Sequence, residues 1–345
     1  MNKNVKSANP LGTQKESKLL VKFAIPCIIS MLVTALYNIV DQIFIGQGIG
    51  INGNAATNIT FPLSTTCTAI SLLLGIGSAT NVSLKLGAKE EEEAANYAGC
   101  GICLMTIFGL ILFAFTSILL TPMLKFFGAT AEVLPFAQEY TRIVAIGFPF
   151  LILTTGSGHL IRADGRPRYS MISMLIGAIV NTILDPIFIF TLDMGMRGAA
   201  LATILGQIVS FSISLRYMFH FKTIRLRRRC FRIRGNYFAN IMRFGASACF
   251  NQIAMTVVQI VMNNVLSHYG ASSVYGSNIP LACAGIITKV NMIFMSFVIG
   301  ISQGIQPVIG FNYGAKKYNR VKKTYLLALA TATFLSLIAF ACFQL

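Results

Sequence analysis

Residues 19–45 read LLVKFAIPCIISMLVTALYNIVDQIFI, a stretch whose only charges are Lys22 and Asp41. A helix that crosses the hydrocarbon core of a bilayer needs about 20 mainly apolar residues. The stretch is too long for the core of a signal peptide, and no small-residue cleavage site follows it. It therefore predicts a membrane-spanning helix.

Eight similar stretches follow within the 345 residues, at 59–86, 96–120, 136–160, 170–192, 199–221, 238–266, 279–311 and 325–343. Hydrophobic residues make up 55% of the chain, charged residues only 11%, and the mean hydropathy is +0.69. Soluble domains usually carry about 25% charged residues, so the composition excludes a water-soluble enzyme. We expect an all-α polytopic membrane protein with nine transmembrane helices.

Basic residues collect before the first stretch and in every second gap between stretches, most densely at 222–237. The alternate gaps are nearly bare, with Lys125 and Arg197 as their only basic residues. The positive-inside rule then places the N-terminus and the basic gaps in the cytoplasm, with the chain in the plasma (inner) membrane. Because the net charge of +17 is accounted for as an insertion signal, we expect the lipid bilayer and no nucleic acid as a partner.

The reactive residue types show no catalytic or metal-binding spacing. The eight cysteines lack a zinc-type pattern, and His159, His220 and His268 are too scattered for an intramembrane metalloenzyme. We therefore expect no enzyme activity and no cofactor.

A short internal repeat divides the chain. Gly77, Gly87 and Lys89 match Gly304, Gly314 and Lys316 at a constant offset of 227 residues. The two copies begin on the same side of the membrane, which is the parallel repeat of many transporters. The expected division is a cytoplasmic tail at 1–18, an N-lobe at 19–221, a basic linker at 222–237 and a C-lobe at 238–345. Since that C-lobe holds three helices against six, we expect the chain to be incomplete, with a genuine nine-helix protein as the alternative.

Ionisable groups inside a membrane are costly and indicate function. Asp41, Asp185, Thr203 and Tyr140 lie on four different stretches, all about 7–10 Å below the outer ends at 1.5 Å per residue. Helical spacing places further polar residues on the same faces: Tyr37, Asn38, Asn181 and Gln207.

These oxygen donors suit a hard cation, which gives a possible Na⁺ site at Asp41, Asn181, Asp185 and Thr203. The same desolvated carboxylates could take up protons instead, or the cluster could only fix helix packing. Lys289 is a secondary candidate because it lies in the middle of the 279–311 stretch, although a lysine can snorkel to the interface. Asp193 is the last acidic residue, so carboxylate-based coupling within this chain must use the N-lobe.

Several segments resemble the MATE (multidrug and toxic compound extrusion) transporters, closest to their bacterial and archaeal branch. They are YNIVDQIFIG at 37–46, GRPR at 165–168, NTILDPIFIF at 181–190, GMRGAALAT at 195–203 and QPVIGFNYGAK at 306–316. The resemblance implies twelve helices in two six-helix lobes. It also implies an antiporter that exports drugs or organic cations in exchange for H⁺ or Na⁺. The cation site of that branch matches Asp41, Asn181, Asp185 and Thr203, with Tyr37 and Tyr140 nearby.

The expected mechanism is alternating access, in which the lobes rock about a fixed site. The nearest rival is a lipid-linked saccharide flippase of the same wider superfamily, which would predict a large cationic cavity. A passive channel would not require two buried carboxylates near one face.

Overall fold

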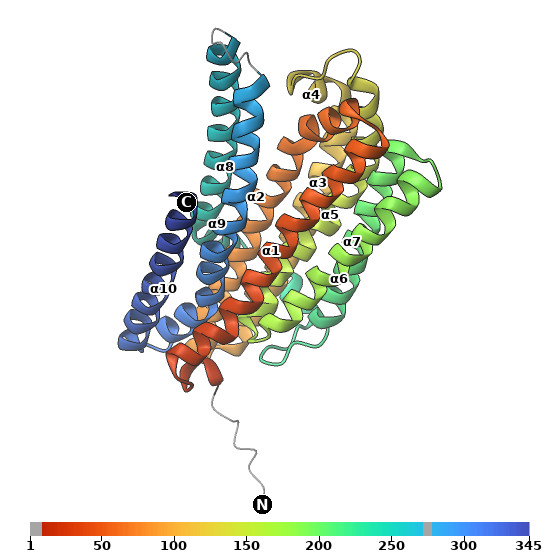
Figure 1. Ribbon diagram of the computed structural model, residues 1–345. Helices are drawn as coiled ribbons and strands as arrows, with labels where there is room; N and C mark the ends of the chain where they lie inside the picture. The colour runs from red at the N-terminus through yellow and green to blue at the C-terminus, as the bar shows by residue number, and fades with distance from the viewer. Residues whose placement is uncertain (1–8, 272–277, 345) are drawn as a thin grey trace, which may run out of the picture.

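The computed structural model describes residues 9–271 and 278–344, and these contain helices and turns but no strand (Figure 1). Nine helices in the described residues are long and apolar enough to cross a membrane. They are α1 (Glu16–Gly48), α2 (Ile51–Gly87), α3 (Glu91–Ile118), α5 (Leu134–Ala163), α6 (Pro167–Pro186), α7 (Gly195–Met218), α8 (Gly235–Ala271), α9 (Asn278–Gly314) and α10 (Tyr318–Gln344). The prediction of an all-α membrane protein with nine spans is confirmed.

Four short elements were not expected from hydropathy: η1 (Pro10–Gly12), α4 (Leu120–Phe126), η2 (Ile187–Thr191) and η3 (Arg228–Phe231). The helix α4 buries Leu120 and Leu124, which lie one turn apart on a single face. Seven residues are too few to span a bilayer, so such an element leaves no mark in a pattern of long apolar stretches.

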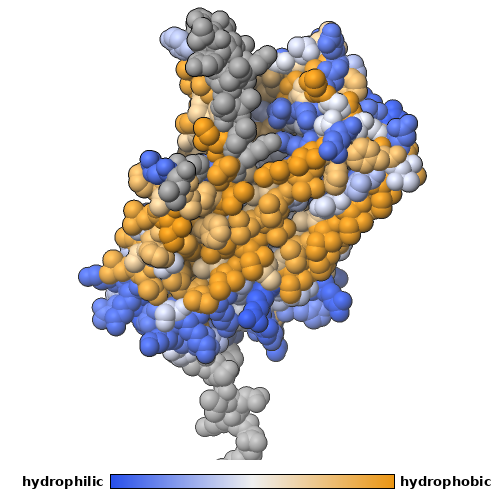
Figure 2. Space-filling model, in the orientation of Figure 1, coloured by the Kyte–Doolittle hydropathy of each residue, from blue (hydrophilic) through white to orange (hydrophobic). Residues whose placement is uncertain are grey.

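The six long helices up to Met218 pack as one bundle, called here the N-terminal bundle. In it α5 packs against α2, α3 and α7, and α6 lies between α1 and α7. The remaining long helices, α8, α9 and α10, make up the second part, in which α10 packs on α9 and α8 contacts α9 less than it contacts α2. Figure 2 shows a broad apolar surface between hydrophilic margins on the face that carries α1 and α6, as expected for a surface in contact with lipid.

The two parts meet along a seam where α1 packs on α9 and α2 packs on α8 and α9. A Cβ at Gly87 would lie 2.0 Å from the carbonyl oxygen of Phe311, and one at Gly314 would lie 1.9 Å from that of Leu84. Both the glycines (314 − 87) and the carbonyls (311 − 84) are separated by 227 residues. The offset found in the sequence therefore relates two equivalent contacts, as a parallel repeat requires.

One end of the molecule, called here the basic end, carries the described N-terminal residues, the α2–α3, α5–α6 and α9–α10 turns and the α7–α8 linker (Figure 1). The linker is packed rather than loose. Cys230 is 6% exposed, its carbonyl lies against Gly99 of α3, and Phe231 accepts a hydrogen bond from Cys103 Sγ at 3.2 Å.

Candidate functional site

Two acidic side chains meet in the N-terminal bundle, away from the basic end. The carboxyl groups of Asp41 on α1 and Asp185 on α6 lie within hydrogen-bonding reach of each other. Asp185 is 0% exposed. No donor among the described residues reaches the buried oxygens Asp41 Oδ1 and Asp185 Oδ2. Two adjacent carboxylates repel each other in a low-dielectric site, so this contact requires a shared proton or a cation.

An amide oxygen with no hydrogen-bond donor lies beside the pair, and a second one lies on α7. Asn181 is 4% exposed and its Nδ2 donates to Asp185 Oδ1 at 3.3 Å, which leaves its own Oδ1 buried without a donor. Gln207 Oε1 is likewise buried without a donor, and it lies against Gly147 of α5. A polar cluster that served packing alone would pair its acceptors with donors, whereas the unpaired atoms here are all acceptors.

Two tyrosines lie beside the acids, and a threonine is hydrogen-bonded to one of these tyrosines. Tyr37 and Tyr140 are both electrostatic neighbours of Asp41 and Asp185, and the Tyr140 hydroxyl is hydrogen-bonded to Thr203. Thr203 Oγ1 donates to a backbone carbonyl at 3.0 Å, so its lone pairs remain able to accept. The structure thus brings together the residues that the sequence placed at one depth.

The three secondary candidates, Asn38, Gln207 and Lys289, lie in different surroundings. Gln207 lies against α5, one turn from Thr203. The side chain of Asn38 bonds within its own helix, since its Nδ2 donates to the Thr34 carbonyl at 2.8 Å. Lys289 is on α9, but its side chain lies outside the described residues.

Small residues position α6 in the bundle. Gly177 packs so closely on α7 that a Cβ there would lie 1.8 Å from Ser210 Oγ. Ser173 Oγ donates to the Ser210 carbonyl at 2.7 Å, and Ser210 Oγ donates back to the Ser173 carbonyl at 2.9 Å. The same face of α6 carries Asn181 and Asp185 at successive turns beyond Gly177, so tight α6–α7 packing sets their position.

A π-helical turn fixes the other side of Asp185. Pro186 has no N–H group and ends regular α-helical pairing, and the chain continues as the π-helical η2. Phe190 of η2 packs edge-on against Phe44 of α1 at 6.3 Å between ring centroids, and Gly48 of α1 lies against Ile189. The sequence analysis did not predict this turn, which ties α6 to α1 beside the acid pair. Such turns occur frequently at functional sites.

The donor set is made of oxygen atoms: two carboxylates, the amide of Asn181 and hydroxyl groups. The described residues contain no group of three or more His, Cys, Asp and Glu that could hold a metal ion. Carboxylate, amide and hydroxyl oxygens suit hard cations. This donor set therefore fits a hard cation or a proton better than a transition metal.

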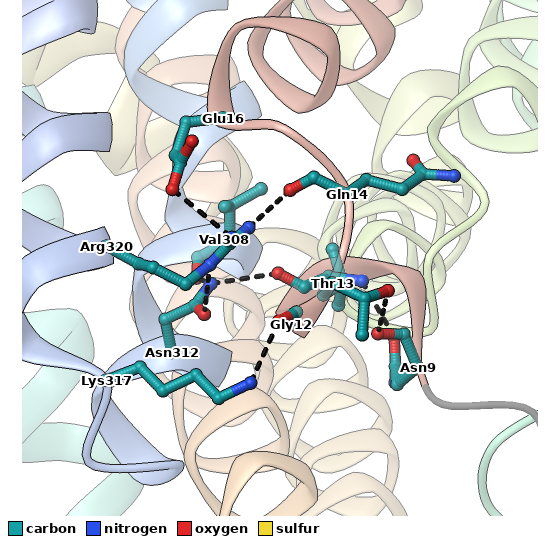
Figure 3. A network of polar contacts seen from close by, with 10 residues as sticks. Asn9, Gly12, Thr13, Gln14, Glu16, Val308, Asn312, Lys317 and Arg320 are labelled. Atoms are coloured by element: carbon teal, nitrogen blue, oxygen red, sulfur yellow. Dashed lines mark hydrogen bonds and ion pairs between the residues drawn. The ribbon is translucent and has the colours of Figure 1, made fainter.

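A second polar network closes the basic end (Figure 3). It joins residues 9–16 to Asn312, Lys317 and Arg320 of the α9–α10 region, and we call it the N-terminal clasp. Asn312 Nδ2 donates to the Leu11 carbonyl at 2.9 Å, and Lys317 Nζ donates to the Gly12 carbonyl at 2.9 Å.

Arg320 makes most of the remaining clasp contacts. Its guanidinium pairs with Glu16 at 3.2 Å, donates to Asn312 Oδ1 at 3.1 Å and donates to the Gln14 carbonyl. Residues 9–18 lie in the segment predicted as a cytoplasmic tail. In the structure α1 already begins at Glu16 and Leu11 is 2% exposed. Side chains of α9, α10 and the turn between them bind the backbone carbonyls of this segment.

The sequence analysis also missed the role of Arg162, since it lies in one of the basic gaps that indicate topology. The side chain is 3% exposed, and its Nη2 donates to Gln303 Oε1 of α9 at 3.3 Å. Arg162 thus adds a polar contact between the N-terminal bundle and α9 at the basic end.

A known family and several curated proteins match the chain in sequence. The family model MatE matches residues 26–187 and 247–345. The multidrug export protein MepA of Staphylococcus aureus (strain NCTC 8325 / PS 47) is 28% identical over 301 residues, which cover 87% of this chain and 65% of MepA. The chain thus spans just under two thirds of the length of MepA. The FAD transporter of Shewanella oneidensis is 27% identical over 319 residues, covering 90% of this chain and 68% of that protein. These relatives are transporters, in agreement with the expectation that the chain is not an enzyme.

Solved structures share the fold. An outward-facing MATE family transporter of the MOP superfamily superposes with a TM-score of 0.89 at 25% identity, covering 97% of this chain and 73% of its own. A MOP superfamily transporter from Pyrococcus furiosus gives 0.88 at 26% identity, covering 96% and 72%. The resemblance noted in the sequence is confirmed, and the chain belongs to the MatE family of multi-pass membrane transporters.

Proposed function

We propose that this chain acts in secondary active efflux, exporting drugs and other organic, often cationic, compounds in exchange for H⁺ or Na⁺. The observation that carries the proposal is the contact between Asp41 and Asp185, two acids whose buried oxygens have no donor among the described residues. A site of this kind is stable only when a proton or cation neutralises it. Its occupancy can therefore be coupled to a gradient.

The proposed orientation places the basic end in the cytoplasm, following the positive-inside rule. The acid pair then lies toward the external side, where it can receive the coupling ion. The close glycine contacts of the seam involve residues 24–28 and 73–87 on one side and 241–245 and 300–314 on the other. All of these lie in the halves of their helices nearest the basic end, as expected for a state closed to the cytoplasm.

The proposed cycle is alternating access between the two parts. Binding of H⁺ or Na⁺ removes the repulsion between Asp41 and Asp185 and changes how α1 sits against α6. Pro26 lies in α1 between Ala24 and Ile28, which contact Gly304 and Gly300 of α9. Because proline lacks the N–H that would bond one turn back, a bend there would shift the seam contacts on both sides of it.

The relatives support transport while differing in cargo. MepA is named for multidrug export and the Shewanella protein for FAD transport. The acid pair belongs to the coupling step in this proposal, so it is compatible with cargo of more than one charge. A lipid-linked saccharide flippase remains the alternative.

Two measurements test the proposal, with Glu139→Gln as the matched control. Glu139 is a carboxylate of α5 that pairs with the exposed Arg197 and, in the described part of the chain, contacts neither acid of the pair. In everted vesicles that contain the chain, Asp41→Asn and Asp185→Asn should each abolish ion-driven efflux of a fluorescent organic cation. Efflux should persist in the control.

Ion binding to the purified chain gives the second measurement, which does not depend on transport. For Na⁺ coupling, binding of ²²Na⁺ should be lost in both Asp variants and kept in the control. For H⁺ coupling, proton release on raising the pH should fall in the Asp variants alone. Unchanged ion binding and unchanged efflux in both Asp variants would overturn the assignment of the site.

A further inference from the structure

A cavity of about 540 Å³ opens at the basic end between α6 and α7, far from the acid pair. Its walls include the apolar or aromatic side chains of Tyr169, Ile172 and Tyr217. Its charged lining is basic and consists of Arg166, Arg168, Arg216 and Lys222, with His220 beside them.

The positive charge of this cavity is not balanced by ion pairs. Within the described part of the chain, no carboxylate is ion-paired with any of its arginines or with Lys222. The acid next to it is Asp164, at the end of α5. Its oxygens accept from the Tyr217 hydroxyl at 2.7 Å, from the backbone N–H groups of Lys222 and Thr223 at 2.9 Å each, and from the Thr223 hydroxyl. Asp164 therefore holds the linker in place with its hydrogen bonds.

An apolar stripe continues from the cavity along α6. Ile172 lines the cavity, and Ile176, Ile179 and Ile183 follow it at spacings of four, three and four residues, which is one helix face. These isoleucines are 43%, 36%, 47% and 55% exposed in chain order. Figure 2 shows an apolar band of this kind directly above the hydrophilic margin of the basic end.

We propose that this cavity binds the phosphate-bearing headgroup of an anionic phospholipid, whose acyl chains lie along the isoleucine stripe. Arginine binds phosphate oxygens with paired N–H donors, and basic pockets between transmembrane helices on the cytoplasmic side are suited to anionic headgroups. A soluble phosphate would use the cations but not the stripe. The cavity is also not needed to orient the chain in the membrane, because Arg225 and Arg227 of the linker supply positive charge without lining it.

The bound lipid would join three segments of the N-terminal bundle. Arg166 precedes α6 and Arg168 lies in its first turn, while Arg216 lies near the end of α7 and Lys222 in the linker. Arg166 and Arg168 also line a neighbouring cavity between α6 and α1, together with Lys18 and Lys22. The headgroup site thus sits beside the helix that carries Asp41.

The test measures lipid binding to the full chain in detergent by native mass spectrometry. Phosphatidylglycerol is the anionic probe, phosphatidylcholine its zwitterionic match, and inorganic phosphate the probe without acyl chains. The cavity variant is Arg168→Gln with Arg216→Gln, and the control is Arg225→Gln with Arg227→Gln, which removes the same charge from the linker. All four side chains are exposed, so both variants should fold.

Each basic group near an anionic headgroup changes affinity by about fivefold, so the cavity variant should bind phosphatidylglycerol about 30-fold more weakly. The control should change by less than about threefold. A second pair, Arg166→Gln with Lys222→Gln, should repeat the loss and serves if the first pair folds poorly. Equal losses in the cavity and control variants, equal binding of phosphatidylcholine, or inorganic phosphate binding as tightly as phosphatidylglycerol would each overturn the proposal.

Discussion

Replacing Arg320 by glutamine should loosen the basic end of the molecule. Arg320 is the residue through which the N-terminal clasp joins α1 to α10, by way of Glu16, Gln14 and Asn312. Glutamine keeps part of the stem and removes the charge. If the clasp holds the seam closed, the substitution should raise the fraction of molecules that are open at this end.

The size of the effect follows from the interactions that glutamine cannot make. The Arg320–Glu16 pair is 22% and 21% exposed at its two side chains, and ion pairs near the surface contribute about 0–1 kcal/mol. Hydrogen bonds from a charged donor contribute about 1.5–3 kcal/mol each, and a glutamine amide can replace one of the two. The closed state should therefore lose about 2–3 kcal/mol relative to the open one, about a 30- to 150-fold change in the equilibrium.

Cys27 is a native reporter for this equilibrium. It is 1% exposed and lies on α1 between Ala24 and Ile28, the residues that contact the seam glycines of α9. A water-soluble maleimide added to the purified chain should reach this thiol only when the basic end opens. Its labelling rate, followed by peptide mass spectrometry, should rise by the factor given above.

Lys322→Gln is the matched control, because it removes one positive charge from an exposed position of α10. Labelling of Cys27 in this variant should match the unmodified chain. Glu16→Gln completes a double-mutant cycle, in which the coupling to Arg320 should be about 0.5–1 kcal/mol. Equal labelling rates in the Arg320 and Lys322 variants would refute the role assigned to the clasp.

Three further substitutions have expected outcomes. Gly314→Ala puts a methyl group 1.9 Å from a carbonyl oxygen of α2. It should destabilise the chain by about 1–3 kcal/mol and lower the thermal midpoint of unfolding. The control Gly235→Ala, whose methyl group meets open space, should leave the midpoint unchanged. Tyr217→Phe removes the 2.7 Å bond to Asp164, costing about 1–2 kcal/mol, and trypsin should cut the linker faster. Gly177→Ala should separate α6 from α7 and weaken binding of the coupling ion about tenfold without removing an ion-binding oxygen; equal ion affinity would contradict that positioning role.

The sequence predicted the parts of the structure that depend on hydrophobic length. All nine spans were found, and Asp41 and Asp185 were placed at one depth because the rise per residue of a helix is constant. The contacts between individual side chains were harder to predict from the sequence. Arg162 lies among other basic residues and was therefore interpreted only as part of the topology signal, although it is buried against Gln303. The clasp residue Leu11 lies in a polar segment with no hydrophobic periodicity. Both contacts join residues far apart in the chain, and hydropathy carries no information about such pairs.

The repeat preserves the packing of the seam but not the chemistry of the site. Gly87 and Gly314 occupy equivalent positions in the two copies, each against a carbonyl of the other helix. Lys22-Phe23 of α1 and Arg243-Phe244 of α8 match at an offset of 221, which places Met262 where α1 has Asp41. Both glycines are required, because α2 and α9 can approach this closely only if neither helix carries a Cβ atom at the contact. A buried acid is costly wherever it is not neutralised, so only the copy that binds the ion needs to carry it. On this reasoning Met262→Asp should add a charge that lacks the partners Asp41 has on α6, and should destabilise the chain rather than create a second coupling site.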